Sequence, residues 1–318
     1  MNNFVSSAIL SVPDSDHDGV VQHHDGAADF SFSSELDCHY EPARATLWSN
    51  WQPSGIPCFS IQLLHAMERG SQSIEGYFAG NEPTRPLHHI VVRSLVPNVF
   101  SLGGDLAYFQ RLIAAKDRAR LIEYARAAVN VTYRNYVSHN LKGVTTIALL
   151  EGDALGGGFE SALSCDVVIA EKHVKAGFPE VLFDMFPGMG GLSFLARRVG
   201  RKTANDMTRT GRQYSAQELL DLGVIDMVVD TGTGMEEVAR LIRQREQQRT
   251  AHTAMNAVDR LLRPVTLQEL TDVVQLWVDS AMQLTPRSLQ WMRRLHQQQV
   301  AAFGRPLALV PPVALAAA

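Results

Sequence analysis

The residues best suited to chemistry lie in one stretch between residues 150 and 192. Glu160 follows a triple glycine at 156–158, and Glu180 follows Phe178 and Pro179 in a largely apolar run. Proton removal from carbon needs an ionised carboxylate, and protonation of a leaving group needs a protonated one. The two glutamates therefore predict acid–base chemistry at carbon. Taken singly, Glu160 as a helix cap and Glu180 as a surface acid are the structural alternatives.

Two glycine turns predict a binding site for developing negative charge. One contains Gly103 and Gly104, and the other contains Gly156 and Gly157. Each turn ends an expected strand and begins an expected helix, so it presents N–H groups at the positive end of a helix dipole. If both turns converge on one oxygen they form an oxyanion hole, in which one donor contributes about 3 kcal/mol. Either turn alone is equally explained by the steric freedom of glycine.

The elements that must position these groups alternate along the chain. Apolar and β-favouring runs predict strands at 45–51, 57–63, 88–95, 144–150 and 224–230. Helices are expected over 105–141, where Asp105 is the cap, and over 191–200 and 202–210. Another helix should begin at the capping box formed by Ser215 and Glu218. A last helical region is expected over 236–303, with breaks at Pro264 and Pro286. This alternation is typical of an α/β protein with a largely parallel sheet.

The composition excludes several classes of protein. The 318 residues are 46% hydrophobic with a net charge of −4, and no strongly basic segment indicates nucleic-acid binding. The three cysteines, Cys38, Cys58 and Cys165, are irregularly spaced, which suggests neither a disulfide framework nor a metal site. No apolar run approaches the ~20 residues of a membrane span, and no signal peptide is evident. We therefore expect a cytoplasmic protein without membrane insertion.

Several motifs together resemble the enoyl-CoA hydratase (crotonase) superfamily. They are 100–106 (FSLGGDL), 151–160 (EGDALGGGFE), Cys165 with Asp166, 178–180 (FPE) and 186–191 (FPGMGG). The resemblance covers residues 48–230. It implies an α/β fold of ββα units wound as a right-handed spiral, a helical C-terminal region, and homo-trimers or hexamers. It also implies that the N–H groups of Gly104 and Gly157 polarise a thioester carbonyl and that Glu160 and Glu180 are the acid–base pair.

Within the superfamily, the layout is most similar to the diffusible signal factor (DSF) synthases, which make cis-2-unsaturated fatty acids for quorum sensing. This implies dehydration of a 3-hydroxyacyl thioester, carried by acyl carrier protein (ACP) or coenzyme A, followed by thioester hydrolysis. It favours Met189, Trp277 and Leu295 as walls of an acyl tunnel. Leu155, Met185 and Phe186 are further candidates from their places beside the glutamates.

The assignment of acid and base stays open at this point. A helix N-terminus near Glu160 favours its ionised form, which makes Glu160 the base and Glu180 the acid, and the reverse is the alternative.

Gly188, Gly190 and Gly191 lack the further residues of a nucleotide site, so no cofactor is expected. Two other functions compete: an enoyl-CoA hydratase of fatty-acid degradation, and a regulatory partner of a sensor-kinase receiver domain.

Four segments are expected along the chain. Residues 1–33 are acidic and polar and predict a mobile tail, and residues 34–235 are the crotonase-like catalytic core. Residues 236–304 are a helical region that covers the substrate and mediates oligomerisation. Residues 305–318 form a terminal tail.

Overall fold

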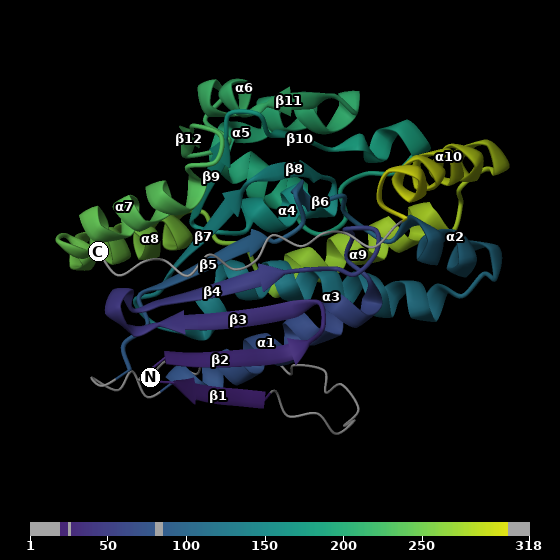
Figure 1. Ribbon diagram of the computed structural model, residues 1–318. Coiled ribbons are helices and arrows are strands. Elements are labelled where there is room, and N and C mark those ends of the chain that lie inside the picture. The colour runs from purple at the N-terminus through teal and green to yellow at the C-terminus, as the bar shows by residue number, and fades with distance from the viewer. Residues whose placement is uncertain (1–19, 25–26, 80–84, 305–318) are drawn as a thin grey trace, which may run out of the picture.

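Strands and helices alternate along most of the chain in the computed structural model (Figure 1), which describes residues 20–24, 27–79 and 85–304. The strands are β1 (Val20–His24), β2 (Ala27–Ser33), β3 (Leu36–Glu41), β4 (Thr46–Trp51), β5 (His89–Ser94), β6 (Asn98–Ser101), β7 (Thr145–Leu150), β8 (Gly152–Leu155), β9 (Val167–Glu171), β10 (Lys175–Gly177), β11 (Gln213–Ser215) and β12 (Met227–Val229). The helices are η1 (Pro42–Arg44), α1 (Ile61–Phe78), α2 (Leu106–Ala114), α3 (Arg118–Tyr136), η2 (Ser138–Asn140), α4 (Gly157–Leu163), η3 (Pro179–Phe183), α5 (Gly191–Thr210), α6 (Ala216–Asp221), α7 (Gly234–Glu246), α8 (Arg249–Leu262), α9 (Leu267–Ala281) and α10 (Pro286–Phe303).

The strands of the described residues form two sheets. The larger runs β1-β2-β3-β4-β5-β7-β9-β12, and the smaller runs β11-β10-β8-β6. Pairing from β4 to β12 is parallel, whereas β1 to β4 form an antiparallel meander at one edge. The predicted α/β class and largely parallel core are confirmed.

A repeated ββα unit links the two sheets. In β5-β6-α2, β7-β8-α4 and β9-β10-α5, the first strand belongs to the larger sheet and the second to the smaller. Because β6 and β8 are adjacent parallel strands, their carboxyl ends lie side by side. This pairing brings the two glycine turns together.

Apolar side chains cover both faces of the larger sheet. On one face, alternate residues such as Val91, Ile147 and Ile169 pack against Val238 and Ile242 of α7. The other face carries the main core, to which α1, α3, α4 and α9 contribute. The strands of a parallel sheet that is covered on both faces have nearly continuous apolar sequences, which is why β5 and β7 are recognisable in the sequence.

The prediction of a mobile tail over residues 1–33 is wrong for its last part. Residues 27–33 form β2, which pairs with β1 and β3. Phe30 is fully buried against α1, and burying such a side chain contributes about 2 kcal/mol. The alternation of Phe30 and Phe32 with Ser and Asp neighbours was too short to predict a strand. Residues 1–19 and the predicted tail at 305–318 lie outside the described residues.

The strand predicted at 57–63 is also wrong. Ser60 is instead the N-cap of α1, and its hydroxyl accepts a hydrogen bond from the N–H of Leu63 at 3.0 Å. A serine before an amphipathic run is a helix-start signal. Because most residues at 57–63 favour a strand, the sequence analysis did not recognise this cap.

The remaining helix signals are confirmed. Asp105 caps α2 and Ser215 forms the capping box of α6. The break between two short helices falls inside α5 at Gly200, where φ is +79°. Pro286 begins α10, so four helices follow residue 233. Over the described ranges no helix is both long and apolar enough to cross a membrane.

Candidate active site

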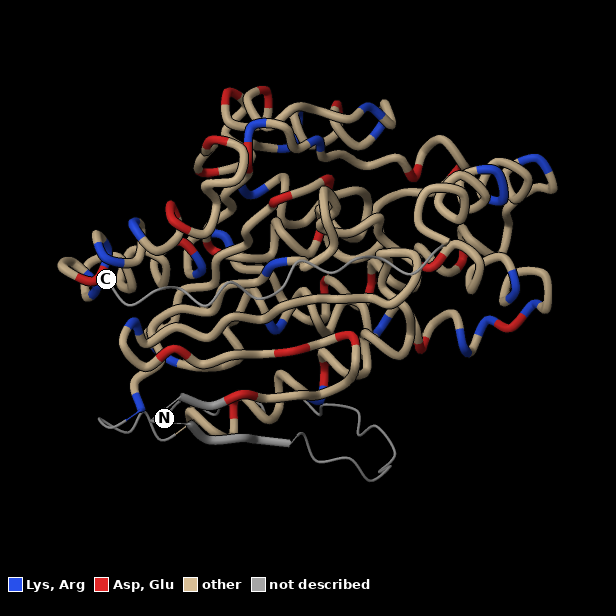
Figure 2. Tube along the Cα trace, viewed as in Figure 1, with Lys and Arg blue, Asp and Glu red and all other residues tan. Residues whose placement is uncertain are grey.

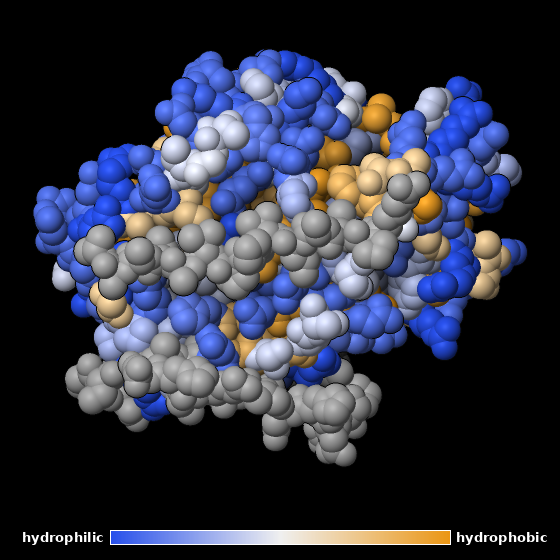
Figure 3. All heavy atoms as spheres, viewed as in Figure 1, coloured by the Kyte–Doolittle hydropathy of each residue, from blue (hydrophilic) through white to orange (hydrophobic). Residues whose placement is uncertain are grey.

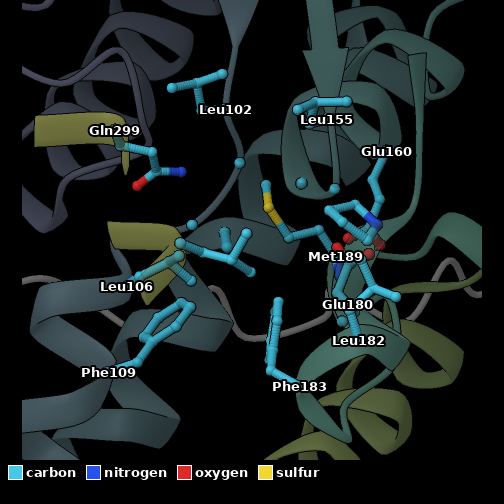
Figure 4. Close-up of a pocket in the computed structure, with 18 of the residues that line it drawn as sticks. Leu102, Leu106, Phe109, Leu155, Glu160, Glu180, Leu182, Phe183, Met189 and Gln299 are labelled. Carbon is cyan, nitrogen blue, oxygen red and sulfur yellow. The ribbon is translucent and has the colours of Figure 1, made fainter. Parts of the chain in front are cut away.

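One cavity of about 340 Å³ lies where the smaller sheet meets the C-terminal helices (Figure 4). Eight of the residues singled out from the sequence line it: Gly104, Leu155, Gly157, Glu160, Glu180, Met189, Trp277 and Leu295. Met185 and Phe186 do not line the cavity, and Met185 is buried in the main core. The remaining wall is mostly apolar and includes Leu106, Phe109, Ala125 and Ala128 from α2 and α3.

The two glycine turns meet at the rim of the smaller sheet. A Cβ atom built on Gly103 would lie 3.1 Å from the nitrogen of Gly157, and one built on Gly157 would lie 3.7 Å from the nitrogen of Gly104. Among the described residues, no acceptor takes the N–H groups of Gly104 and Gly157. The two glycine nitrogens thus lie close together at the wall of the cavity that both residues line.

A tyrosine that the sequence analysis missed holds the first turn. The hydroxyl of Tyr124 donates to the carbonyl of Phe59 at 2.5 Å and accepts from the N–H of Asp105 at 3.2 Å. Gly104 packs on Phe109 so closely that an added Cβ would lie 2.5 Å from the ring. No local pattern identifies Tyr124, because its partners lie 19 and 65 residues away.

Glu160 is buried but well supplied with hydrogen-bond donors. It projects from the first turn of α4, and Oε2 accepts from the N–H groups of Met189 at 2.7 Å and Gly191 at 2.6 Å. Burial raises its pKa to about 7, and the N–H groups of Gly191, Met189 and Gly188 limit that rise. A helix N-terminus whose N–H group bonds the carboxylate is thus that of α5, which the sequence analysis did not identify.

Glu180 lies in η3 and has no comparable support. Its Oε1 packs against Gly156, where a Cβ atom would overlap it, and its Oε2 has no hydrogen-bond partner among the described residues. Burial, and then the charge of Glu160, raise the pKa of Glu180 well above its usual value. The two carboxyl groups thus differ in how easily they ionise. The surroundings of Glu180 favour its protonated form, whereas the N–H donors make Glu160 the easier to ionise.

The turn at 188–191 connects the glutamates to the rest of the site. The buried hydroxyl of Thr132 donates to the carbonyl of Met189 at 2.9 Å, which fixes the Met189–Gly190 peptide between the two N–H groups that donate to Glu160. The Met189 sulfur lies directly over Gly157. Sequence reasoning excluded a nucleotide site in this glycine-rich turn but missed its contact with Glu160.

Three other titratable side chains, those of Asp153, Asp166 and His89, lie outside the cavity. Asp153 accepts from the N–H of Lys175 at 2.8 Å, and Asp166 accepts from that of Thr146 at 2.9 Å. His89 is buried in β5, and burial lowers its pKa to about 4. The two aspartates therefore hold neighbouring backbone segments in place.

The fold of ββα units that build a large and a small sheet defines the crotonase class. Residues 78–297 match the enoyl-CoA hydratase/isomerase family. This match covers more than half of the chain, and the chain therefore belongs to that family.

Solved structures of the same class are similar in fold. An enoyl-CoA hydratase from Bacillus halodurans has a TM-score of 0.68 and 20% identity, covering 82% of this chain and 100% of that one. Human mitochondrial delta3-delta2-enoyl-CoA isomerase also has a TM-score of 0.68, with 19% identity over 83% of this chain and 99% of that one. At such identities the likeness concerns the fold alone.

Sequence relatives include hydratases of CoA thioesters. "Probable enoyl-CoA hydratase 2, mitochondrial" of Arabidopsis thaliana is 31% identical over 175 residues, covering 54% of this chain and 55% of that protein. Mouse mitochondrial methylglutaconyl-CoA hydratase is 34% identical over 143 residues, covering 44% and 42%. The chain spans about half the length of these relatives.

Proposed function

We propose that this protein dehydrates a 3-hydroxyacyl thioester and then hydrolyses the thioester, releasing a cis-2-unsaturated fatty acid of the DSF type. The observation that carries the proposal is the pairing of two buried glutamates of different pKa with two unsatisfied N–H groups in one apolar cavity. An α-proton beside a thioester becomes removable only when the enolate oxygen is stabilised. The N–H groups of Gly104 and Gly157 would supply that stabilisation.

In the first step the glutamates act in opposite directions. Glu160, ionised, takes the proton from C2, and the enolate forms on the thioester oxygen. The enolate then expels the 3-hydroxyl group, which leaves as water with the proton of Glu180, and the C2–C3 double bond forms. Afterwards Glu160 is protonated and Glu180 is ionised.

The second step can return both groups to their starting states. Ionised Glu180 takes a proton from water as the water oxygen attacks the thioester carbon, and the same N–H pair holds the tetrahedral oxyanion. Collapse of this intermediate breaks the C–S bond, and Glu160 protonates the departing thiolate. One site thus completes dehydration and hydrolysis with no net change in protonation.

An enoyl-CoA hydratase of fatty-acid degradation is the second candidate, and the names of the relatives favour it. One further relative is the fatty acid oxidation complex subunit alpha of Vibrio cholerae, 27% identical over 215 residues but matched over only 29% of its length. In that function the same glutamates and N–H pair would add water to a trans-2-enoyl-CoA.

Product analysis separates these functions. We expect purified protein to convert 3-hydroxydodecanoyl-ACP into free cis-2-dodecenoic acid, detected by mass spectrometry and compared with both geometric standards. A parallel reaction uses the coenzyme A thioester. If trans-2-enoyl-CoA is the only product, the hydratase function is correct and the synthase proposal is wrong.

We infer that the protein self-associates through α8, in line with the predicted trimer or hexamer. Its polar side faces inward: Asn256 donates to Thr145 at 3.2 Å and Arg260 to Asp166 at 2.6 Å. Its apolar side faces outward, with Leu261 80% and Leu262 72% exposed. Contiguous apolar surface of this kind marks an interface, and a neighbouring copy of the chain would offer apolar surface that covers it.

Sedimentation velocity tests this interface. The wild type is expected to sediment as an oligomer, whereas Leu261→Asp should shift it toward the monomer, because a charge would be buried at the contact. Leu276→Asp is the matched control, since Leu276 is 63% exposed on α9. A monomeric wild type, or equal effects of both substitutions, would rule out α8 as the interface.

The proposed sensor-kinase partner rests on the acidic N-terminal segment, most of which precedes the described residues. Copurification with an isolated receiver domain would test it, and failure of that domain to bind the full chain would reject it. The expected cytoplasmic location likewise stays a prediction.

A further inference from the structure

The helix α10 carries an exposed stripe of arginine and tryptophan beside the cavity. Arg287, Trp291 and Arg294 are spaced by four and three residues and share one side of the helix, and all three are exposed. The Arg294 guanidinium lies 5.3 Å from the centre of the Trp291 ring. Four residues beyond Arg294 the same stripe reaches Gln298, which lines the cavity. The stripe therefore leads along the helix to the opening of the site.

Positive charge is concentrated here although the whole chain is acidic. Helix α10 contains three arginines and no acidic residue, while the chain carries a net charge of −4. Among the described residues, none of the three arginines of α10 has a carboxylate within ion-pair distance. Because these arginines pair with no acid in the described part of the chain, their charge is available to a partner.

Helix α2 extends the same surface. It packs against α10 and lines the cavity with Leu106 and Phe109. Arg111 and Lys116, at its C-terminal end, are exposed and have no carboxylate partner in the described part of the protein. Figure 2 shows Lys and Arg gathered over α10 and the end of α2, and in Figure 3 this edge of the molecule is hydrophilic beside exposed apolar residues.

We propose that this surface, formed by Arg287, Trp291, Arg294, Arg111 and Lys116, docks an acidic carrier protein that presents the acyl thioester to the cavity. The inference rests on the proposed function, which requires a thioester substrate. The stripe from Arg287 to Gln298 extends about 16 Å along the helix, which suits a protein surface better than one nucleotide. Exposed Trp and Arg beside an opening are the residue types that dominate protein interfaces.

The attachment of α10 is compatible with this role. Only Ser288 and Met292 of the helix are buried, and neither belongs to the stripe. The arginines therefore support no internal packing, so replacing them changes the partner surface without opening the core. Carrier proteins are acidic, and rim charges of opposite sign speed association and hold the complex.

Charge reversal at two arginines tests the docking surface. The double variant Arg287→Glu/Arg294→Glu is expected to raise KM for a 3-hydroxyacyl-ACP about tenfold or more, with little change in kcat. The same acyl group on N-acetylcysteamine should be turned over as by the wild type, because that thioester has no carrier surface. Arg243→Glu, at an exposed arginine of α7, is the matched control and should leave both substrates unaffected.

Three outcomes would overturn the proposal. They are an equal loss on both substrates, an effect on the coenzyme A thioester alone, and an unchanged KM for the carrier-bound substrate. Loss of binding to phosphatidylglycerol vesicles with normal binding of the carrier would instead assign the surface to a membrane.

If the wild type turns over none of the thioesters, the proposed function is wrong, and direct binding decides the surface separately. Fluorescence anisotropy with labelled holo-ACP should then give a Kd raised about tenfold or more in the double variant and unchanged in Arg243→Glu. Equal binding by all three proteins would reject the surface.

Discussion

Replacing Glu160 by Gln is expected to lower kcat for a 3-hydroxyacyl thioester by about 10²–10⁴-fold, and Glu180→Gln by a similar factor. Glutamine keeps the shape of each side chain but can neither take nor deliver the proton. The double variant should be little worse than either single one, because both glutamates serve the same transition state. Steady-state kinetics on the ACP thioester measure all three effects. Full turnover by either single variant would exclude the two-carboxylate mechanism.

The pH profile assigns the roles of base and acid. Glu160, with a pKa raised to about 7, must be ionised to act as base, so the rate should fall as pH drops below about 7. Glu180 must be protonated to act as acid, so the rate should fall again above its pKa, which burial and the charge of Glu160 raise well above the usual value. Because the two carboxyls interact, the two apparent pKa values of the pH–rate profile describe the pair of glutamates and not each residue separately. A profile that is flat on the acid side of pH 7 would contradict Glu160 as the base.

Thermal unfolding will distinguish a loss of chemistry in these variants from a failure to fold. A carboxyl whose pKa is raised by folding favours the folded state at low pH, and this contribution is lost as pH rises through the folded pKa. For Glu160 that window runs from its ordinary 4.5 to about 7. Glu160→Gln and Glu180→Gln should therefore unfold at or above the wild-type temperature at pH 8. A lower unfolding temperature would indicate a structural cause for lost activity.

The reacting groups were predictable because each is marked by its immediate neighbours. Glycine pairs, a following glutamate and a capping aspartate are short patterns, and adjacent parallel strands then bring them together. The environment that separates the two pKa values was not predictable. The donors to Glu160 are the N–H groups of Met189 and Gly191, which are 29 and 31 residues away in the sequence. A local sequence pattern does not show that these segments come together in the fold.

The errors in the fold have the same origin. The strand at 27–33 is ordered by burial of Phe30 under α1, a contact between segments far apart in the sequence. Helix α8 has an ordinary amphipathic sequence, yet its polar side faces the protein through Arg260 and Asn256. Periodicity predicts that a helix has two sides, but it does not say which of them meets the core.

Gly156→Ala is expected to lower kcat about a hundredfold by moving Glu180. Gly156 has φ +51°, and an added Cβ would overlap Oε1 of Glu180. The methyl group must displace the carboxyl, and misplacing a catalytic group by about 1 Å costs on the order of 10² in rate. The strained backbone should also cost about 1–3 kcal/mol of stability.

Gly223→Ala separates displacement of Glu180 from backbone strain. Gly223 has φ +73° with open space where the Cβ would be, and it lies outside the cavity. This control should lose about 1 kcal/mol of stability and keep its kcat, because only the backbone is strained. Kinetics and thermal unfolding on both variants measure the difference. Equal activity in the two proteins would mean that the contact between Glu180 and Gly156 does not position the acid.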